Sequence, residues 1–299
     1  MRKFSRKDLP SFVSTAAVLG VAVAIFNGLS NESAKAWDIR LGFWFIFLVG
    51  LVALGAFIWN IPELIRNVRK AMPSKLPLFL ALGVTLALGT FVSTQIHRQH
   101  RVLSDENSWT SMAMEMYFDH LGGVCNQGTW SDGRLHCTDI VNNFKGKSLA
   151  LLEAAAFLVA PINRDTALFL NFPLYLGSLL LFFMAISRFM NNGWLGLVAM
   201  TFLGSMPILM MQAQSASTEV LYIFLLNLLL FFYAYIPPDR VEWKHLIFVI
   251  PLLGLFSGTR QETLFCFLPF ALYYEDFLRR KTWHLPLFTA LVILASWPA

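Results

Sequence analysis

The chain has 299 residues, of which 57% are apolar and 14% are charged, and phenylalanine alone occurs 28 times. Because soluble domains carry about 25% charged residues, this composition excludes an ordinary soluble protein and requires lipid as well as a protein core. The formal net charge of +5 comes from short basic clusters between apolar runs. That pattern orients membrane helices, so we do not expect nucleic-acid binding.

Apolar runs predict the membrane spans, because a helix satisfies its own backbone hydrogen bonds in hydrocarbon. The candidates are residues 12–30, 41–59, 76–96, 167–187, 194–214, 217–236, 245–257, 263–275 and 284–299. The run 149–162 is also apolar, but it is shorter and is interrupted by Glu153. We therefore predict an all-α, polytopic transmembrane bundle.

Lysine and arginine predict the orientation of these spans. Basic residues in 1–7 place the N-terminus in the cytoplasm, and those in 66–75 return the chain there after two spans. A third span then places a large loop, 97–148, outside. If 149–162 lies flat as an interfacial helix and does not cross, the later basic loops also face the cytoplasm. The positive-inside rule favours this arrangement.

The expected organisation has two parts. Residues 1–75 hold two extra N-terminal spans, and residues 76–299 form the main membrane module. Residues 1–36 also resemble a signal peptide, but we favour a retained anchor because the polar stretch before the cleavage-like site is long. The chain ends at Trp297-Pro298-Ala299 within an apolar run, which predicts the N-terminal part of a longer protein or a truncated product.

The large loop carries most of the polar residues. Cys125 and Cys137 both lie in it, which favours a disulfide if the loop faces an oxidising compartment, with free thiols or a metal pair as alternatives. Arg98 and Arg101 could hold a lipid phosphate or simply anchor the helix in the interface. Asp105 and Glu106 could act as a general base or as metal ligands, or could merely solvate and cap a helix start.

Two further polar links fall between predicted spans. Residues 212–219 end in Glu219, and residues 259–262 contain Arg260 and Glu262. Arg260 could pair with Glu262 or Glu219, or could serve a function, since ionisable groups at such depth usually face a cavity or each other. The predicted topology gathers both links and the acidic pair at position 105 on the outer face, where we expect one shared pocket.

Four features in a fixed order carry a resemblance to a known family. They are Ser104-Asp105-Glu106 after a span, the entry Gly146-Lys147-Ser148 before the interfacial helix, the link 212–219, and Gly258-Thr259-Arg260-Gln261-Glu262. Over residues 76–299 the chain resembles the GT-C membrane glycosyltransferases, which include protein O-mannosyltransferases and the aminoarabinose transferase of lipid A. Where many members have two prolines after the lysine-type entry, this chain has Ser148-Leu149.

The resemblance implies sugar transfer from a polyprenyl-phosphate donor to a glycan, lipid or protein acceptor at the periplasmic face of a bacterial inner membrane. Asp105 would be the general base, and Glu106 would support it or help to bind a divalent cation, Mg²⁺ or Mn²⁺, which only some members require. Arg260, with Lys147, would neutralise the leaving phosphate. Glu219 would orient the sugar or hold Arg260, with Glu262, Arg98 and Arg101 as further substrate-binding candidates.

Two other functions fit the composition. A flippase or transporter for a lipid-linked saccharide would also need a polytopic bundle, although such proteins often carry internal repeats and discontinuous helices. A non-catalytic subunit of a membrane assembly would fit a chain that ends within an apolar run.

Overall fold

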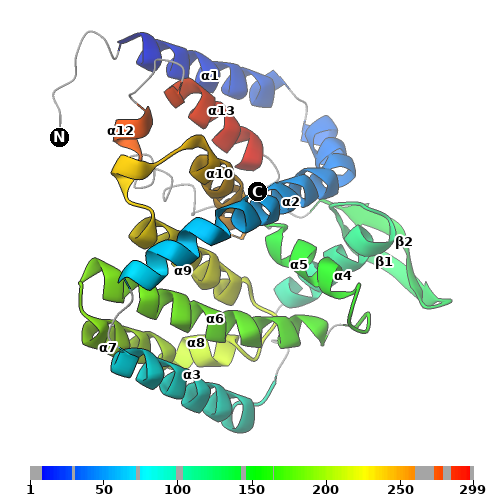
Figure 1. The fold of residues 1–299 in the computed structure, drawn as a ribbon. Coiled ribbons are helices and arrows are strands. Elements are labelled where there is room, and N and C mark those ends of the chain that lie inside the picture. Colours follow the sequence, from blue (N-terminus) through cyan, green and yellow to red (C-terminus); the bar gives the residue numbers. More distant parts are fainter. Residues whose placement is uncertain are drawn as a thin grey trace.

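The computed structural model describes residues 9–28, 31–71, 75–98, 104–142, 146–163, 165–259, 273–278 and 284–296. Of the described residues, 78% are helical, and Figure 1 shows the helices packed into a bundle from which a two-stranded hairpin projects. The mostly helical architecture agrees with the apolar runs of the sequence.

Within these described ranges, four helices are long and apolar enough to cross a membrane: α2 (Asn31–Ala71), α3 (Lys75–Gln95), α6 (Thr166–Phe189) and α9 (Thr218–Tyr235). The length and composition of these helices indicate a multi-pass membrane protein. Helix α2 has 41 residues and is therefore about 60 Å long, roughly twice the thickness of a bilayer's hydrocarbon core. It must extend beyond that core, whereas we predicted a span over 41–59 alone.

The remaining predicted spans correspond to other helices. They are α1 (Leu9–Gly28), α7 (Gly193–Gly204), α8 (Pro207–Gln212), α10 (Trp243–Ser257) and α13 (His284–Ser296). The predicted span 194–214 is divided into α7 and α8, because Pro207 begins a new helix and cannot continue the old one. The prediction over 263–275 lies mostly outside the described residues. Near it, α12 covers Glu275–Leu278.

Contacts between helices define two ends of the bundle. Helices α6 and α9 run parallel, since Asn171 bonds to the backbone of Ser215 and Tyr235 bonds to that of Met184. Helix α7, which comes between them in the chain, packs on α6 and α3. We name the end that holds the starts of α2, α6 and α9 the hairpin end, and the end that holds their last turns the opposite end. The hairpin end corresponds to the face that the sequence analysis predicted to be outer.

The loop 97–148 contains one helix and a two-stranded hairpin that was not predicted. It forms α4 (Ser104–Phe118), β1 (Val124–Ser131) and β2 (Arg134–Val141), so the all-α prediction was incomplete. The strands pair antiparallel around a two-residue turn, with Ser131 opposite Arg134. Asp132 and Gly133 both have positive φ, at 53° and 71°, as the tightest hairpin turns require.

Helix α5 (Ser148–Ala156) follows the hairpin. It ends earlier than the interfacial helix predicted over 149–162. Its buried face, with Ala150 and Ala154, packs on Met112 and Met116 of α4 and on Phe43 of α2. Helices α4 and α5 therefore form one small module that closes the hairpin end.

Candidate functional site

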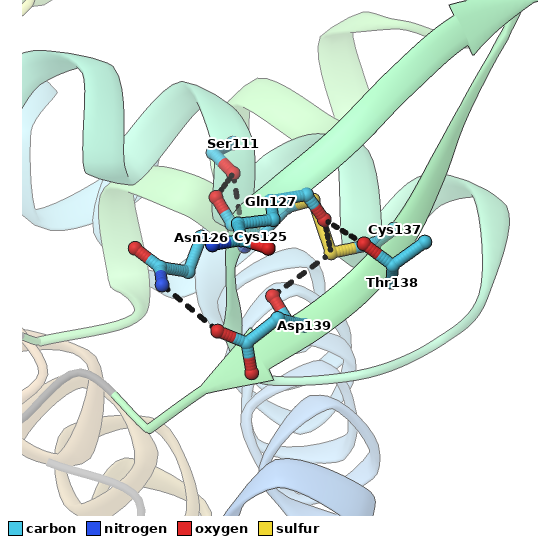
Figure 2. The surroundings of a disulfide bond; sticks show 7 residues. All are labelled: Ser111, Cys125, Asn126, Gln127, Cys137, Thr138 and Asp139. Carbon is cyan, nitrogen blue, oxygen red and sulfur yellow. Dashed lines mark hydrogen bonds between the residues drawn. A yellow bond between two sulfur atoms is a disulfide. The ribbon is translucent and has the colours of Figure 1, made fainter.

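The disulfide fixes the hairpin to the rest of the hairpin end. The sulfur atoms of Cys125 and Cys137 are bonded to each other, and Figure 2 shows their surroundings. Ser111 of α4 accepts a hydrogen bond at Oγ from the Cys125 N–H at 3.0 Å, and its Oγ lies 3.3 Å from the Cys125 carbonyl. Cys125 therefore joins β1 to α4 through Ser111 and to β2 through the disulfide.

The lysine-containing entry packs directly against the end of α10. The Ser148 N–H donates to the carbonyl of Gly258 at 3.0 Å, and Ser148 Oγ donates to the carbonyl of Leu255 at 2.6 Å. A Cβ atom on Gly146 would lie 2.0 Å from the Gly258 oxygen, so only glycine permits this approach. The structure therefore brings together two segments that the sequence analysis proposed as parts of one site.

Lys147 is buried in this contact and forms an ion pair. Its Nζ lies 2.5 Å from Oδ1 of Asp38 in α2, and the lysine side chain is only 3% exposed. The end of its aliphatic stem passes Gly42 and Gly122, where an added Cβ would come within 3.1 Å of Cε. Asp38 was not among the predicted site residues. A single acid ahead of an apolar run carries no sign of a partner 109 positions away.

Helix α4 begins with the predicted acidic pair. Asp105 and Glu106 lie in its first turn, and the structure describes their backbone but not their side chains. Position 106 precedes Thr110 by about one turn on the same face of the helix. Thr110 Oγ1 in turn donates to Glu153 of α5 at 3.4 Å. The start of α4 is therefore placed beside α5, which carries a buried acid.

Glu153 is fully buried, and the other oxygen of its carboxyl group has no hydrogen-bond partner among the described residues. Burial raises the pKa of Glu153 to about 8, and the hydrogen bond from Thr110 opposes this only partly. Its side chain is therefore mostly protonated at neutral pH. The sequence signal was an acid that interrupts an apolar run, which usually marks a paired or functional group.

A second buried acid lies beneath the hairpin. Glu115 is 1% exposed and lines a cavity of about 390 Å³ together with Asp119, Arg134 and Cys137. Burial and the neighbouring Asp119 raise the pKa of Glu115 to about 7, against the influence of Arg134. Ligand atoms of Glu115, Cys125 and Cys137 lie within 4.8 Å of one another, but the disulfide leaves neither sulfur available as a thiolate ligand.

Arg98 belongs to a different part of the hairpin end. Its Nε donates to Gln214 at 3.2 Å, and its guanidinium lies 4.2 Å from the ring centroid of Phe169. Asn171 of α6 donates to the carbonyls of Ser215 and Ser217 at 2.6 and 2.8 Å. The predicted polar link before α9 is thus a buried, hydrogen-bonded turn that Arg98 contacts from the end of α3.

An apolar cavity of about 320 Å³ lies beside Ser148, at the start of α5. Its walls come from α2, α5, α6, α9 and α10, and Ser148 is its polar lining residue. Leu221, another wall residue, follows Glu219 by two positions in the first turns of α9. Leu51 and Leu54 of α2 also line it and are about half exposed, so the cavity reaches the outer, apolar surface of the bundle.

The structure therefore assembles only part of the predicted site. It brings Gly146 and Ser148 to Gly258, and Arg98 to the link that ends in Glu219. Arg101, Arg260 and Glu262 lie outside the described residues, although position 260 directly follows Thr259. Comparisons with protein-family models, with curated proteins and with solved structures found no match to this chain.

Proposed function

We propose that this protein is a membrane glycosyltransferase that moves a sugar from a polyprenyl-phosphate donor to an acceptor at the hairpin end of the bundle. The observation that supports the proposal most directly is the apolar cavity beside Ser148. An isoprenoid chain is wholly apolar, and a cavity with one polar wall residue suits a part of such a chain. Its position next to the 146–148 and 258–259 segments would put the phosphate near Arg260.

In the proposed site, Lys147 and Arg260 have different roles. Asp38 lies 2.5 Å from Lys147 and offsets most of its field. In this proposal Lys147 therefore fixes the entry segment, and Arg260 contacts the phosphate. A guanidinium can hold two phosphate oxygens at once, which stabilises the negative charge that develops as the donor is cleaved.

In the proposed reaction the sugar gains a bond to the acceptor, loses its bond to the phosphate, and one proton is transferred. The acceptor hydroxyl or amine attacks the anomeric carbon of the sugar, and the bond between that carbon and the phosphate oxygen breaks. Asp105 takes the proton of the acceptor, and the polyprenyl phosphate leaves with the electron pair. An ordinary aspartate is ionised at neutral pH and can act as this base.

Variants of Asp105 test the proposal in living cells. Mass spectrometry of envelope glycans and glycolipids would compare wild type, a gene deletion, Asp105→Asn and Asp132→Asn. We expect one sugar to be lost in the deletion and in Asp105→Asn, with both variant proteins present in membranes at wild-type levels. Asp132→Asn is the matched control, since it makes the same change at an exposed hairpin turn. An Asp105→Asn strain that matches wild type while the deletion differs would remove Asp105 from the mechanism.

One observation favours a second candidate, a transporter of a lipid-linked saccharide. The break between α7 and α8 is a discontinuous helix, a feature of many transporters. However, Tyr175 donates to the freed Gly204 carbonyl at 2.8 Å, which explains the break as a satisfied packing feature. In the same four strains, a labelled donor that crosses the bilayer unchanged would favour transport over transfer.

A further inference from the structure

A second cavity, of about 430 Å³, lies at the opposite end of the bundle. Three cations line it, and each comes from a different element: Lys70 from α2, Arg188 from α6, and Arg240 from the short helix η2 (Pro238–Arg240). Its other polar side chains are Asn67, Asn191 and Tyr235. We name this space the cation cavity.

The walls of the cation cavity are held in place by hydrogen bonds. Asn67 donates from Nδ2 to the Tyr235 carbonyl at 3.0 Å, which joins the last turns of α2 and α9. The Tyr235 hydroxyl lies 3.4 Å from the Met184 carbonyl of α6. Asn191 has a φ of 49° and turns the chain sharply after α6. These hydrogen bonds therefore hold in place the helix ends that carry Lys70 and Arg188.

Among the described residues, little negative charge compensates the cations of this cavity. Within the described part of the chain, no acidic residue lines it, and neither Lys70 nor Arg188 forms an ion pair. Arg240 is 3.9 Å from Asp239, and both side chains are more than two-thirds exposed, so this pair is weak. Three like charges around one space repel each other, and a bound anion would relieve that repulsion.

Helix dipoles and membrane orientation explain why basic residues occur near the last turns of α2 and α6. They do not explain why cations from three elements meet around a single polar cavity. Arginine side chains bind phosphate oxygens in pairs, and basic pockets between membrane helices are suited to phosphorylated headgroups. The volume also lies in the range of small-ligand sites.

We propose that the cation cavity binds a phosphate group carried by a lipid headgroup or by a small soluble ester. This site is separate from the proposed transfer site, because the cavity is formed by the last turns of α2, α6 and α9, whereas Ser148 and Gly258 lie at the hairpin end. Binding would hold α2, η2 and the end of α6 together. The assignment does not depend on the proposed glycosyltransferase activity.

The test uses the full chain, purified in detergent and also reconstituted in nanodiscs. Equilibrium dialysis with radiolabelled inorganic phosphate and with glycerol 3-phosphate measures soluble anions, and native mass spectrometry measures retained phosphatidylglycerol against phosphatidylcholine. The cavity variant is Arg188→Gln with Arg240→Gln. The control is Arg66→Gln with Arg69→Gln, which removes the same charge from exposed residues of α2 that do not line the cavity.

We expect the cavity variant to bind at least 10-fold more weakly than wild type and the control to bind normally. Binding of the soluble phosphates assigns a soluble ester, and binding of phosphatidylglycerol alone assigns a lipid headgroup. Equal weakening in both variants, or no preferential binding by wild type, would overturn the proposal. If the double variant does not fold, Lys70→Gln against Arg69→Gln repeats the comparison with one charge.

Discussion

The segment around Lys147 at the hairpin end and the cation cavity at the opposite end treat their charges in opposite ways. At the hairpin end, Lys147 is 3% exposed and pairs with Asp38, and Glu153 is fully buried against Thr110. At the opposite end, Lys70, Arg188 and Arg240 line an open cavity and stay largely in contact with solvent. Lys147 and Glu153 are enclosed by the protein, whereas the cation cavity leaves positive charge available to something outside it.

This difference separates charges that build the fold from charges that are free to bind. A buried ion pair costs a great deal when one partner is removed, because the other is left uncompensated. An exposed cation near a helix end contributes little to stability and is screened by salt. We therefore expect substitutions at the hairpin end to affect folding, and charge removal at the cation cavity to affect binding alone.

The largest effect is expected at Gly146. An alanine there would place Cβ 2.0 Å from the Gly258 oxygen, and backbone atoms cannot move aside as a flexible side chain can. Gly146→Ala should therefore cost about 3 kcal/mol or more, at the upper end of overpacking effects. Thermal unfolding followed by size-exclusion chromatography in detergent measures the loss. Gly55→Ala is the control, since nothing lies within 4 Å of its added Cβ and a helical alanine should be neutral or stabilising. Equal behaviour of the two variants would contradict the close contact.

Asp38→Asn is expected to have a smaller effect. It leaves Lys147 buried without its anion, which destabilises a fully buried pair by about 3–5 kcal/mol. Because the Asp38 side chain is 23% exposed, we expect about 2 kcal/mol. Chemical denaturation in micelles measures the change. The double variant with Lys147→Met should recover most of the loss, and a double variant as unstable as the single one would show that the pair is not the cause.

The effect that is smallest at pH 5, and the most specific, is expected from Glu153→Gln. The pKa of Glu153 in the folded protein is raised to about 8 from a reference of 4.5. The folded state therefore binds the extra proton, and stability is lost as pH rises from about 4.5 to about 8. Since glutamine stays neutral, the free energy of unfolding of the variant should rise relative to that of wild type by up to about 1.4 kcal/mol per pH unit in this window. Unfolding midpoints of both proteins at pH 5, 6, 7 and 8 measure the difference, and parallel curves would rule out an ionising Glu153.

Much of the helical framework follows from the sequence. Apolar runs predict where α3, α6 and α9 lie to within a few residues, because lipid and a protein core both favour apolar side chains. The run at 41–59 did not reveal that α2 continues for 41 residues. Its flanks are polar, and only contacts such as Lys147 with Asp38 and Asn67 with Tyr235 show what those turns pack against.

The hairpin had a usable signal that was missed. Asp132-Gly133 is a strong indicator of a two-residue turn, because both residues tolerate positive φ. The flanking strands alternate only weakly between apolar and polar residues, with most of β1 exposed, so periodicity gave no support. A disulfide between residues 12 apart was also consistent with a short hairpin across that turn.

The sequence predicted which segments form the candidate site, but it did not predict which side chains pair with each other. Sequence order placed the 146–148 entry and the 258–262 segment on one face, and the structure brings Gly146 and Gly258 into contact. The partner of Lys147 could not be predicted, since pairing with Asp38 depends on how α2 passes the entry. The cation cavity was likewise hidden, because its three cations lie 52 to 170 positions apart along the chain.

The contact between Gly146 and Gly258 also constrains the order of events during biosynthesis. The Ser148 N–H finds its acceptor on Gly258, a residue made 110 positions later. At ribosomal rates of roughly 5–20 residues per second, that interval is on the order of 10 s. The first turn of α5 therefore cannot dock until α10 has been synthesised. A ribosome that stalls between the two segments would leave Lys147 beside a space that α10 has not yet filled.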